Sequence, residues 1–112
     1  MRALWTALAL GACTLAATET LYVDNPAYCD LPAAEQELVD LATLLPTGIE
    51  SHGQSCTWDR PLGYAPGLAR TVTATCDNGA ERWQTPVEVT VNPDGSVTAP
   101  APGLPHRFFP CT

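Results

Sequence analysis

The chain has 112 residues, a length that fits one domain and leaves little room for a second. Its net charge is -7, and because all five basic residues are scattered arginines, the chain lacks the positive surface that nucleic acids or anionic lipids would bind. The absence of lysine also excludes Schiff-base chemistry and a P-loop. Eleven prolines, eight glycines and five cysteines indicate a small, turn-rich domain that is held by disulfides.

The first residues have the layout of a secretory signal. Residues 3–17 carry no charge and follow a single arginine, Arg2. This run of 15 residues is shorter than the roughly 18–20 apolar residues that a membrane-spanning helix needs. We therefore expect the segment to direct export rather than to serve as a permanent transmembrane anchor.

Within this run, Leu10-Gly11-Ala12-Cys13 resembles the lipobox of bacterial lipoproteins, in which a cysteine after two small residues becomes the lipidated N-terminus. The resemblance covers these four residues and the apolar run before them, and no domain family is recognised. It implies a signal peptide over residues 1–12, a lipid on Cys13 that binds the membrane, a tether over residues 13–28 and a folded domain over residues 29–112. The protein would then lie in the bacterial cell envelope, facing the periplasm or the exterior. Ordinary cleavage after residue 17, which would release a secreted protein, is the alternative.

Four cysteines remain under either reading: Cys29, Cys56, Cys76 and Cys111. An even set in a small exported domain predicts two disulfides. The closest two of these cysteines are 20 residues apart, which argues against zinc and against a redox pair. We favour Cys29–Cys56 with Cys76–Cys111, which would lock a helix onto a sheet. The pairing Cys56–Cys76 with Cys29–Cys111 stays open.

One helix is expected, over residues 33–45. Ala34, Leu38, Leu41 and Leu45 recur at helical spacing, and Pro46 with Gly48 would end the helix.

The rest of the chain alternates in the manner of β-strands. Strands are expected over residues 55–58, 70–76, 83–91 and 96–99, and a short extended stretch over residues 21–23. Asn78-Gly79 predicts a hairpin turn with two positive-φ residues, and residues 92–95 predict a second turn. Residues 99–112 contain four prolines and are expected to be extended and polyproline-like. The expected fold is α+β: one N-terminal helix packed on a three- to four-stranded antiparallel meander, with two disulfides and a proline-rich C-terminal tail.

The sequence offers no convincing catalytic group, and we expect no enzyme, no cofactor and no metal. Ser51, His52 and Ser55 are too close in sequence to converge readily as a triad, and His106 lies in the proline-rich tail. A metal set of His52, Cys56 and Asp59 would require a free Cys56, which the disulfides exclude.

The leading hypothesis is a non-enzymatic, lipid-anchored envelope protein that binds or interacts with an unknown envelope partner. The alternatives are a secreted protease-inhibitor-like protein, which would present residues 58–65, and, more remotely, a small hydrolase that uses His52. Trp58 and Trp83 are expected in the core, and Tyr64 is expected to be exposed. Two apolar clusters are candidates for a partner surface, unless the phenylalanines simply pack on the sheet: Leu62, Tyr64 and Leu68, and Leu104, Phe108 and Phe109.

Overall fold

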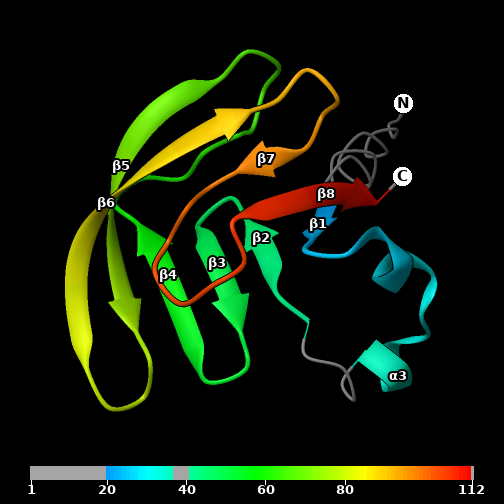
Figure 1. The fold of residues 1–112 in the computed structure, drawn as a ribbon, viewed down its shortest axis with the longest axis horizontal. Coiled ribbons are helices and arrows are strands. Elements are labelled where there is room, and N and C mark those ends of the chain that lie inside the picture. Colours follow the sequence, from blue (N-terminus) through cyan, green and yellow to red (C-terminus); the bar gives the residue numbers. More distant parts are fainter. Residues whose placement is uncertain (1–19, 37–40, 112) are drawn as a thin grey trace, which may run out of the picture.

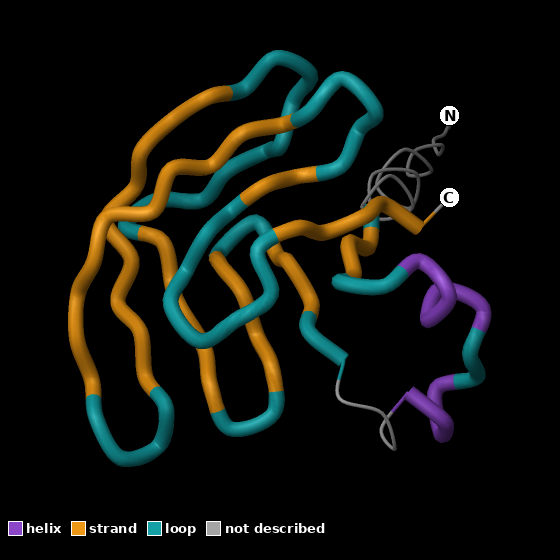
Figure 2. The backbone as a smooth tube through the Cα atoms, viewed as in Figure 1, coloured by secondary structure: helices purple, strands orange, loops and turns teal. Residues whose placement is uncertain are grey.

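The computed structural model, which describes residues 20–36 and 41–111, is a closed antiparallel barrel of eight strands (Figure 1). Each strand pairs with the next along the chain, and β8 returns to pair with β1. The two short helices lie to one side of the barrel, between β1 and β2 (Figure 2). In chain order the elements are β1 (Leu21–Val23), η2 (Pro26–Asp30), α3 (Ala33–Gln36), β2 (Thr43–Leu45), β3 (Gly48–Ser51), β4 (Gln54–Trp58), β5 (Ala69–Asp77), β6 (Arg82–Val91), β7 (Val97–Thr98) and β8 (Arg107–Cys111).

The predicted α+β fold is wrong, because the described residues form a closed barrel and their two helical segments, η2 and α3, are too short to cover a sheet. Helical structure within residues 33–45 is limited to α3, residues 37–40 lie outside the described part, and Thr43–Leu45 is a strand. Ala42 and Leu44 are buried, whereas Thr43 is half-buried, which is the period of a strand. The leucines of this segment fit the spacing of a helix as well as that of a strand, and Pro46 lies in the turn between β2 and β3 instead of ending a helix.

The barrel interior is filled by inward-facing side chains, as is usual for a small barrel. At one level, residues paired from strand to strand form a row around the barrel: Tyr22, Leu44, Ile49, Cys56, Cys76 and Trp83. Trp58 is buried and Trp83 packs against the core, so both are core residues as expected. The core therefore lies inside the barrel and not between a helix and a sheet.

The strands predicted from Ser55 onward are present within one or two residues of the expected ends. The β5–β6 hairpin turns at the predicted place, but Asp77 pairs with Arg82, which leaves a loop of residues 78–81. Of the two residues expected at positive φ, Gly79 alone has it, at 91°. Asn78 acts instead through its side chain, whose Oδ1 accepts hydrogen bonds from the amides of Ala80 and Glu81.

Both disulfides are present, and the four predicted cysteines form them, but the favoured pairing is wrong. Cys56–Cys76 joins two directly paired residues of β4 and β5, and Cys29–Cys111 joins η2 to the end of β8. Cys111 also pairs with Leu21 of β1, so the second bridge lies where the two ends of the described chain close the barrel. The favoured pairing assumed a helix over residues 33–45 that had to be fastened to a sheet, whereas the described part of that segment contains the short α3 and the strand β2.

One end of the barrel, which we call the closed end, is covered by residues 99–106 between β7 and β8. Ala99 and Ala101 are fully buried and Leu104 is 7% exposed, so this segment enters the barrel mouth. The side chain of Gln54 donates a hydrogen bond to the carbonyl of Pro102 at 2.9 Å and holds the segment to β4. The expected polyproline-like tail is therefore a turn-containing plug followed by a strand, since Arg107–Cys111 is β8.

Candidate functional site

At the opposite end, the cleft end, residues 59–68 between β4 and β5 fold back over the barrel mouth. Backbone hydrogen bonds run from Leu62 N to Pro46 O at 2.9 Å and from Val91 N to Leu68 O at 2.9 Å, and they tie this loop to both sides of the mouth. Leu62 and Tyr64, which belong to this loop, have buried side chains. The loop is thus a fixed part of the barrel and not a free arm.

Tyr64 is the central side chain of this loop, and its predicted exposure is wrong because the residue is only 6% exposed. Its hydroxyl accepts a hydrogen bond from the Trp58 indole Nε1–H at 2.9 Å and donates one to the carbonyl of Leu45. Its backbone has a φ of 52°, a left-handed conformation that is uncommon for a bulky residue. The surrounding contacts hold this residue in a conformation it would not adopt alone.

Burial also sets the protonation state of Tyr64. Desolvation raises the pKa of its hydroxyl from 10.0 to about 12, although the hydrogen bond from Trp58 acts in the opposite direction. The hydroxyl is therefore neutral at physiological pH, in keeping with its role as a donor to the Leu45 carbonyl.

A cleft of about 440 Å³ opens beside Tyr64 at the cleft end. Tyr22 of β1 meets Tyr64 edge to face, with ring centroids 5.5 Å apart and ring planes at 63°. None of the described residues that line the cleft carries a charge; they are Thr20, Tyr22, Tyr64, Pro66, Gly67, Val91, Asn92, Pro93, Gly95 and Pro110. Its volume lies in the lower part of the range of about 300–1,000 Å³ that is typical of small-molecule sites.

The wall opposite the tyrosines is the β6–β7 turn, which is held by a connected set of polar groups. The buried Ser96 Oγ donates to Asp94 Oδ1 at 2.6 Å and accepts from Asn92 Nδ2 at 3.1 Å and Arg107 Nε at 3.1 Å. Arg107 also pairs with Asp94 Oδ2 at 2.8 Å. The hydrogen bonds from Ser96 and the charge of Arg107 lower the pKa of the Asp94 carboxyl. This network keeps the second wall of the cleft in place.

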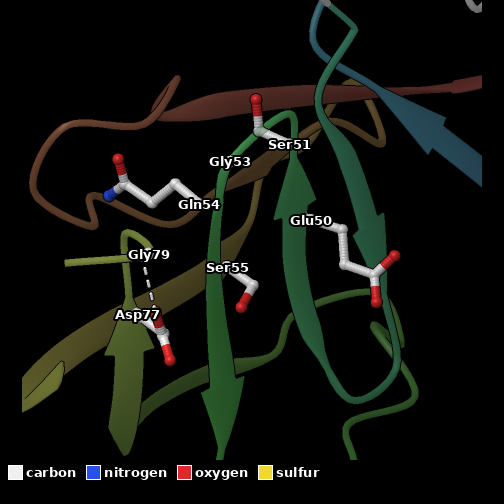
Figure 3. Close-up of a pocket in the computed structure, with 7 residues that line it drawn as sticks. All are labelled: Glu50, Ser51, Gly53, Gln54, Ser55, Asp77 and Gly79. Carbon is white, nitrogen blue, oxygen red and sulfur yellow. Dashed lines mark hydrogen bonds between the residues drawn. The ribbon is translucent and has the colours of Figure 1, made fainter. Parts of the chain in front are cut away.

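A second hollow, of about 270 Å³, lies toward the closed end on the outside of β3, β4 and β5 (Figure 3). Glu50, Ser55 and Asp77 stand at paired positions there. The side chain of Glu50 points away from Asp77, and Asp77 accepts a hydrogen bond from Gly79 N at 2.7 Å. The carboxylates do not converge on a common point, so the hollow does not form an acid–base pair.

The other predicted site residues are placed as follows. His52 and His106 are both exposed, and neither lines a hollow described above. Within residues 20–36 and 41–111, no group of three or more His, Cys, Asp or Glu side chains could hold a metal ion. Cys13 and its signal segment lie outside the described residues.

The predicted partner surface is wrong for most of its members. Leu62, Leu104 and Phe108 are buried in the core, and Phe109 is half-buried beneath the guanidinium of Arg107, which is 5.3 Å from its ring centroid. Phe108 thus packs inside the barrel, close to the alternative that the phenylalanines pack on the sheet, whereas Phe109 does not enter the core cluster. The loop proposed for a protease inhibitor likewise has Trp58, Leu62 and Tyr64 turned inward.

Sequence reasoning missed the cleft because its lining comes from four separate segments, two of which are loops or turns. The available signal was the concentration of proline and glycine between strands, at residues 64–67, where they follow Tyr64, and at residues 92–95. No helix of the described chain is both long and apolar enough to cross a membrane. Searches of protein families, of curated proteins and of solved structures found no match to this chain.

Proposed function

We propose that the protein is a non-enzymatic binding protein of the bacterial cell envelope, attached to the membrane through a lipid on Cys13, with its ligand site in the cleft beside Tyr22 and Tyr64. The observation that carries this proposal is the cleft itself: an uncharged hollow at a barrel mouth, between two walls that hydrogen bonds hold in place. Barrel mouths are a frequent position for ligand sites.

The route of the chain agrees with such an anchor. Thr20, which lines the cleft, follows Cys13 by seven residues, and so few residues span at most about 25 Å when fully extended. A lipid on Cys13 would therefore keep the cleft end close to the membrane surface. The closed end lies at the far side of the barrel from Thr20.

The ionisable groups support a binding role more than a catalytic one. Among the described residues, the two groups with a clear pKa shift are Tyr64 and Asp94, and each uses its polar atoms in hydrogen bonds that fix a wall of the cleft. A general acid or base needs a polar atom directed at a substrate. The hydroxyl of Tyr64 and both carboxylate oxygens of Asp94 are instead engaged within the walls.

The proposal is tested on the protein produced in a bacterial host with its own leader. Intact mass reports whether Cys13 carries lipid, and fractionation should move a Cys13→Ser variant from the membrane to the soluble fraction. Native mass spectrometry of the gently purified protein should show a bound small molecule. Thr20→Trp, which places a bulky ring at the cleft, should remove that molecule, whereas Thr71→Trp on the exposed outer face of β5 should retain it.

Two results would contradict the proposal. A wild-type chain that is soluble and begins after residue 17 would show that Cys13 is no anchor. A bound molecule that survives Thr20→Trp, or the absence of any ligand from both proteins, would show that the cleft is not the site.

A further inference from the structure

We infer that the cleft takes an uncharged molecule built on one or two flat rings, which fits into the corner between Tyr22 and Tyr64. This inference rests on the proposed binding function and names the class of ligand. Four observations carry it: the angle between the tyrosine rings, the chemistry of the opposite wall, the lack of charge and the polar atoms left at the rim.

The two tyrosines form a corner and not a flat wall. The two rings are in contact, with centroids 5.5 Å apart and planes at 63°, so a ligand ring that lies beside this contact can meet the face of one tyrosine and the edge of the other. Both contacts are favourable geometries for aromatic rings. Tyr64 cannot turn away to spoil the corner, because hydrogen bonds to Trp58 and Leu45 fix its far end.

The remaining walls match a flat ring better than a flexible chain. Pro66, Pro93 and Pro110 line the cleft with rigid rings that have no side-chain rotamers to order on binding. Val91 is 8% exposed and borders the cleft as a small apolar surface. A cleft of about 440 Å³ with such walls favours a compact ligand.

Charge and hydrogen bonding narrow the class further. Among the described residues, no Asp, Glu, Arg or His lines the cleft, so an ionised ligand would lose hydration without gaining a partner there. The side-chain nitrogen of Asn92, Nδ2, donates hydrogen bonds to Ser96 and Thr98. The side-chain oxygen Oδ1 is left to accept a hydrogen bond from a ligand at the rim. A neutral ring system with one donor group satisfies all of these features.

The test compares three probes on the full chain carrying Cys13→Ser, so that no lipid competes for them. N-phenyl-1-naphthylamine is neutral and has flat rings and an N–H donor, and 8-anilino-1-naphthalenesulfonate adds one negative charge to the same framework. Decanol is neutral but has no ring. The first probe should bind one to one, the sulfonate at least about tenfold more weakly, and decanol should not displace the first probe.

Variants show whether the corner formed by Tyr22 and Tyr64 is responsible for binding the neutral probe. Tyr22→Ala should weaken the neutral probe by roughly 10- to 30-fold, in the range of a lost aromatic anchor, while Tyr22→Phe should bind it nearly as well because the ring remains. The matched control is Leu21→Ala, at an exposed neighbouring position that does not line the cleft. Far-ultraviolet circular dichroism of each variant confirms that the barrel is folded.

Equal binding of the two naphthalene probes, displacement by decanol, or full binding by Tyr22→Ala would overturn the inference. These results differ from a failure of the proposed function. If native mass spectrometry shows a charged or purely aliphatic molecule that Thr20→Trp removes, the cleft is a binding site and the ligand class inferred here is wrong.

Discussion

The two ends of this barrel are covered by segments of similar composition, yet one is filled and the other holds a cleft. Residues 59–68 and residues 99–106 are both rich in proline and glycine, and both fold back over a mouth. At the closed end, Ala99 and Ala101 are small enough to enter the barrel mouth, and both are fully buried there. At the cleft end, Tyr64 is large, and it stands against Tyr22 as a wall instead of filling the space.

The comparison teaches that two covering loops of similar amino-acid composition can differ in role. The size of the side chains at the mouth, more than the content of proline and glycine, decides whether the loop plugs the mouth or forms the wall of a cleft. It also predicts that substitutions at the two ends have different consequences. Changes near the closed end should cost stability. Removal of the Tyr22 ring from the cleft wall should cost ligand binding and leave most of the stability intact.

The largest effect is expected for Phe108→Ala, beside the closed end. Phe108 is fully buried and pairs with Val97, so its loss should lower the free energy of unfolding by about 3–5 kcal/mol. Denaturant unfolding measures this change. The neighbouring Phe109→Ala is the matched control, and it should cost clearly less because Phe109 is half-buried. Equal costs would contradict the packing described here.

Removal of the Cys29–Cys111 bridge is expected to come next. A double variant, Cys29→Ser with Cys111→Ser, should lose about 2–4 kcal/mol, because the bridge connects residues 82 apart and lies where β1 and β8 close the barrel. The cleft should be affected as well, since Tyr22 and Pro110 belong to these two strands. Unchanged stability and unchanged probe binding would show that β1 and β8 close the barrel without the bridge.

Tyr64→Phe sharpens the comparison at the cleft end, because it keeps the ring and removes the hydroxyl. Trp58 Nε1–H then loses its buried partner, and we expect a loss of about 1–3 kcal/mol with little change in probe binding. The folded-state pKa is raised, so the contribution of this hydroxyl is present below pH 10 and is lost as the pH rises from 10.0 to about 12. Unfolding measured against pH should show this loss in the wild type and not in Tyr64→Phe.

The smallest effect is expected for Asp94→Asn in the β6–β7 turn. The folded-state pKa of Asp94 is lowered, so its stabilising contribution is present above the ordinary carboxyl pKa of 3.8 and is lost as the pH falls through the lowered value. The variant should show a weaker dependence of stability on acid pH than the wild type. Glu88→Gln, on the exposed outer face of β6, is the control and should keep that dependence.

The strands from β4 to β7 could be predicted because alternation of apolar and polar residues is a local signal. Val72, Ala74 and Cys76 point inward in turn, and the hairpin turn after them is marked by Asn78 and Gly79. Closure of the barrel had no such signal. It depends on pairing between Leu21–Val23 and Arg107–Cys111, two short segments at opposite ends of the described chain.

The wrong helix and the missed cleft share a physical cause, which is that local patterns do not report what lies across the barrel. The leucines of residues 38–45 fit two periods, and pairing with β1 and β3 selected the strand for Thr43–Leu45. Tyr64 sits in a loop whose composition is typical of exposed turns, and its burial depends on Trp58 and Leu45. The cysteines were identified from sequence, but their partners followed from the closed barrel.

The most direct test of the account is a nuclear magnetic resonance titration of the full chain carrying Cys13→Ser with N-phenyl-1-naphthylamine. We predict saturable shifts at the cleft end, at Tyr22, Gly67, Asn92 and Gly95, with residues 99–106 unchanged. Shifts centred on residues 99–106, or spread evenly through the core, would contradict the claim that one end of the barrel is a binding site and the other a plug.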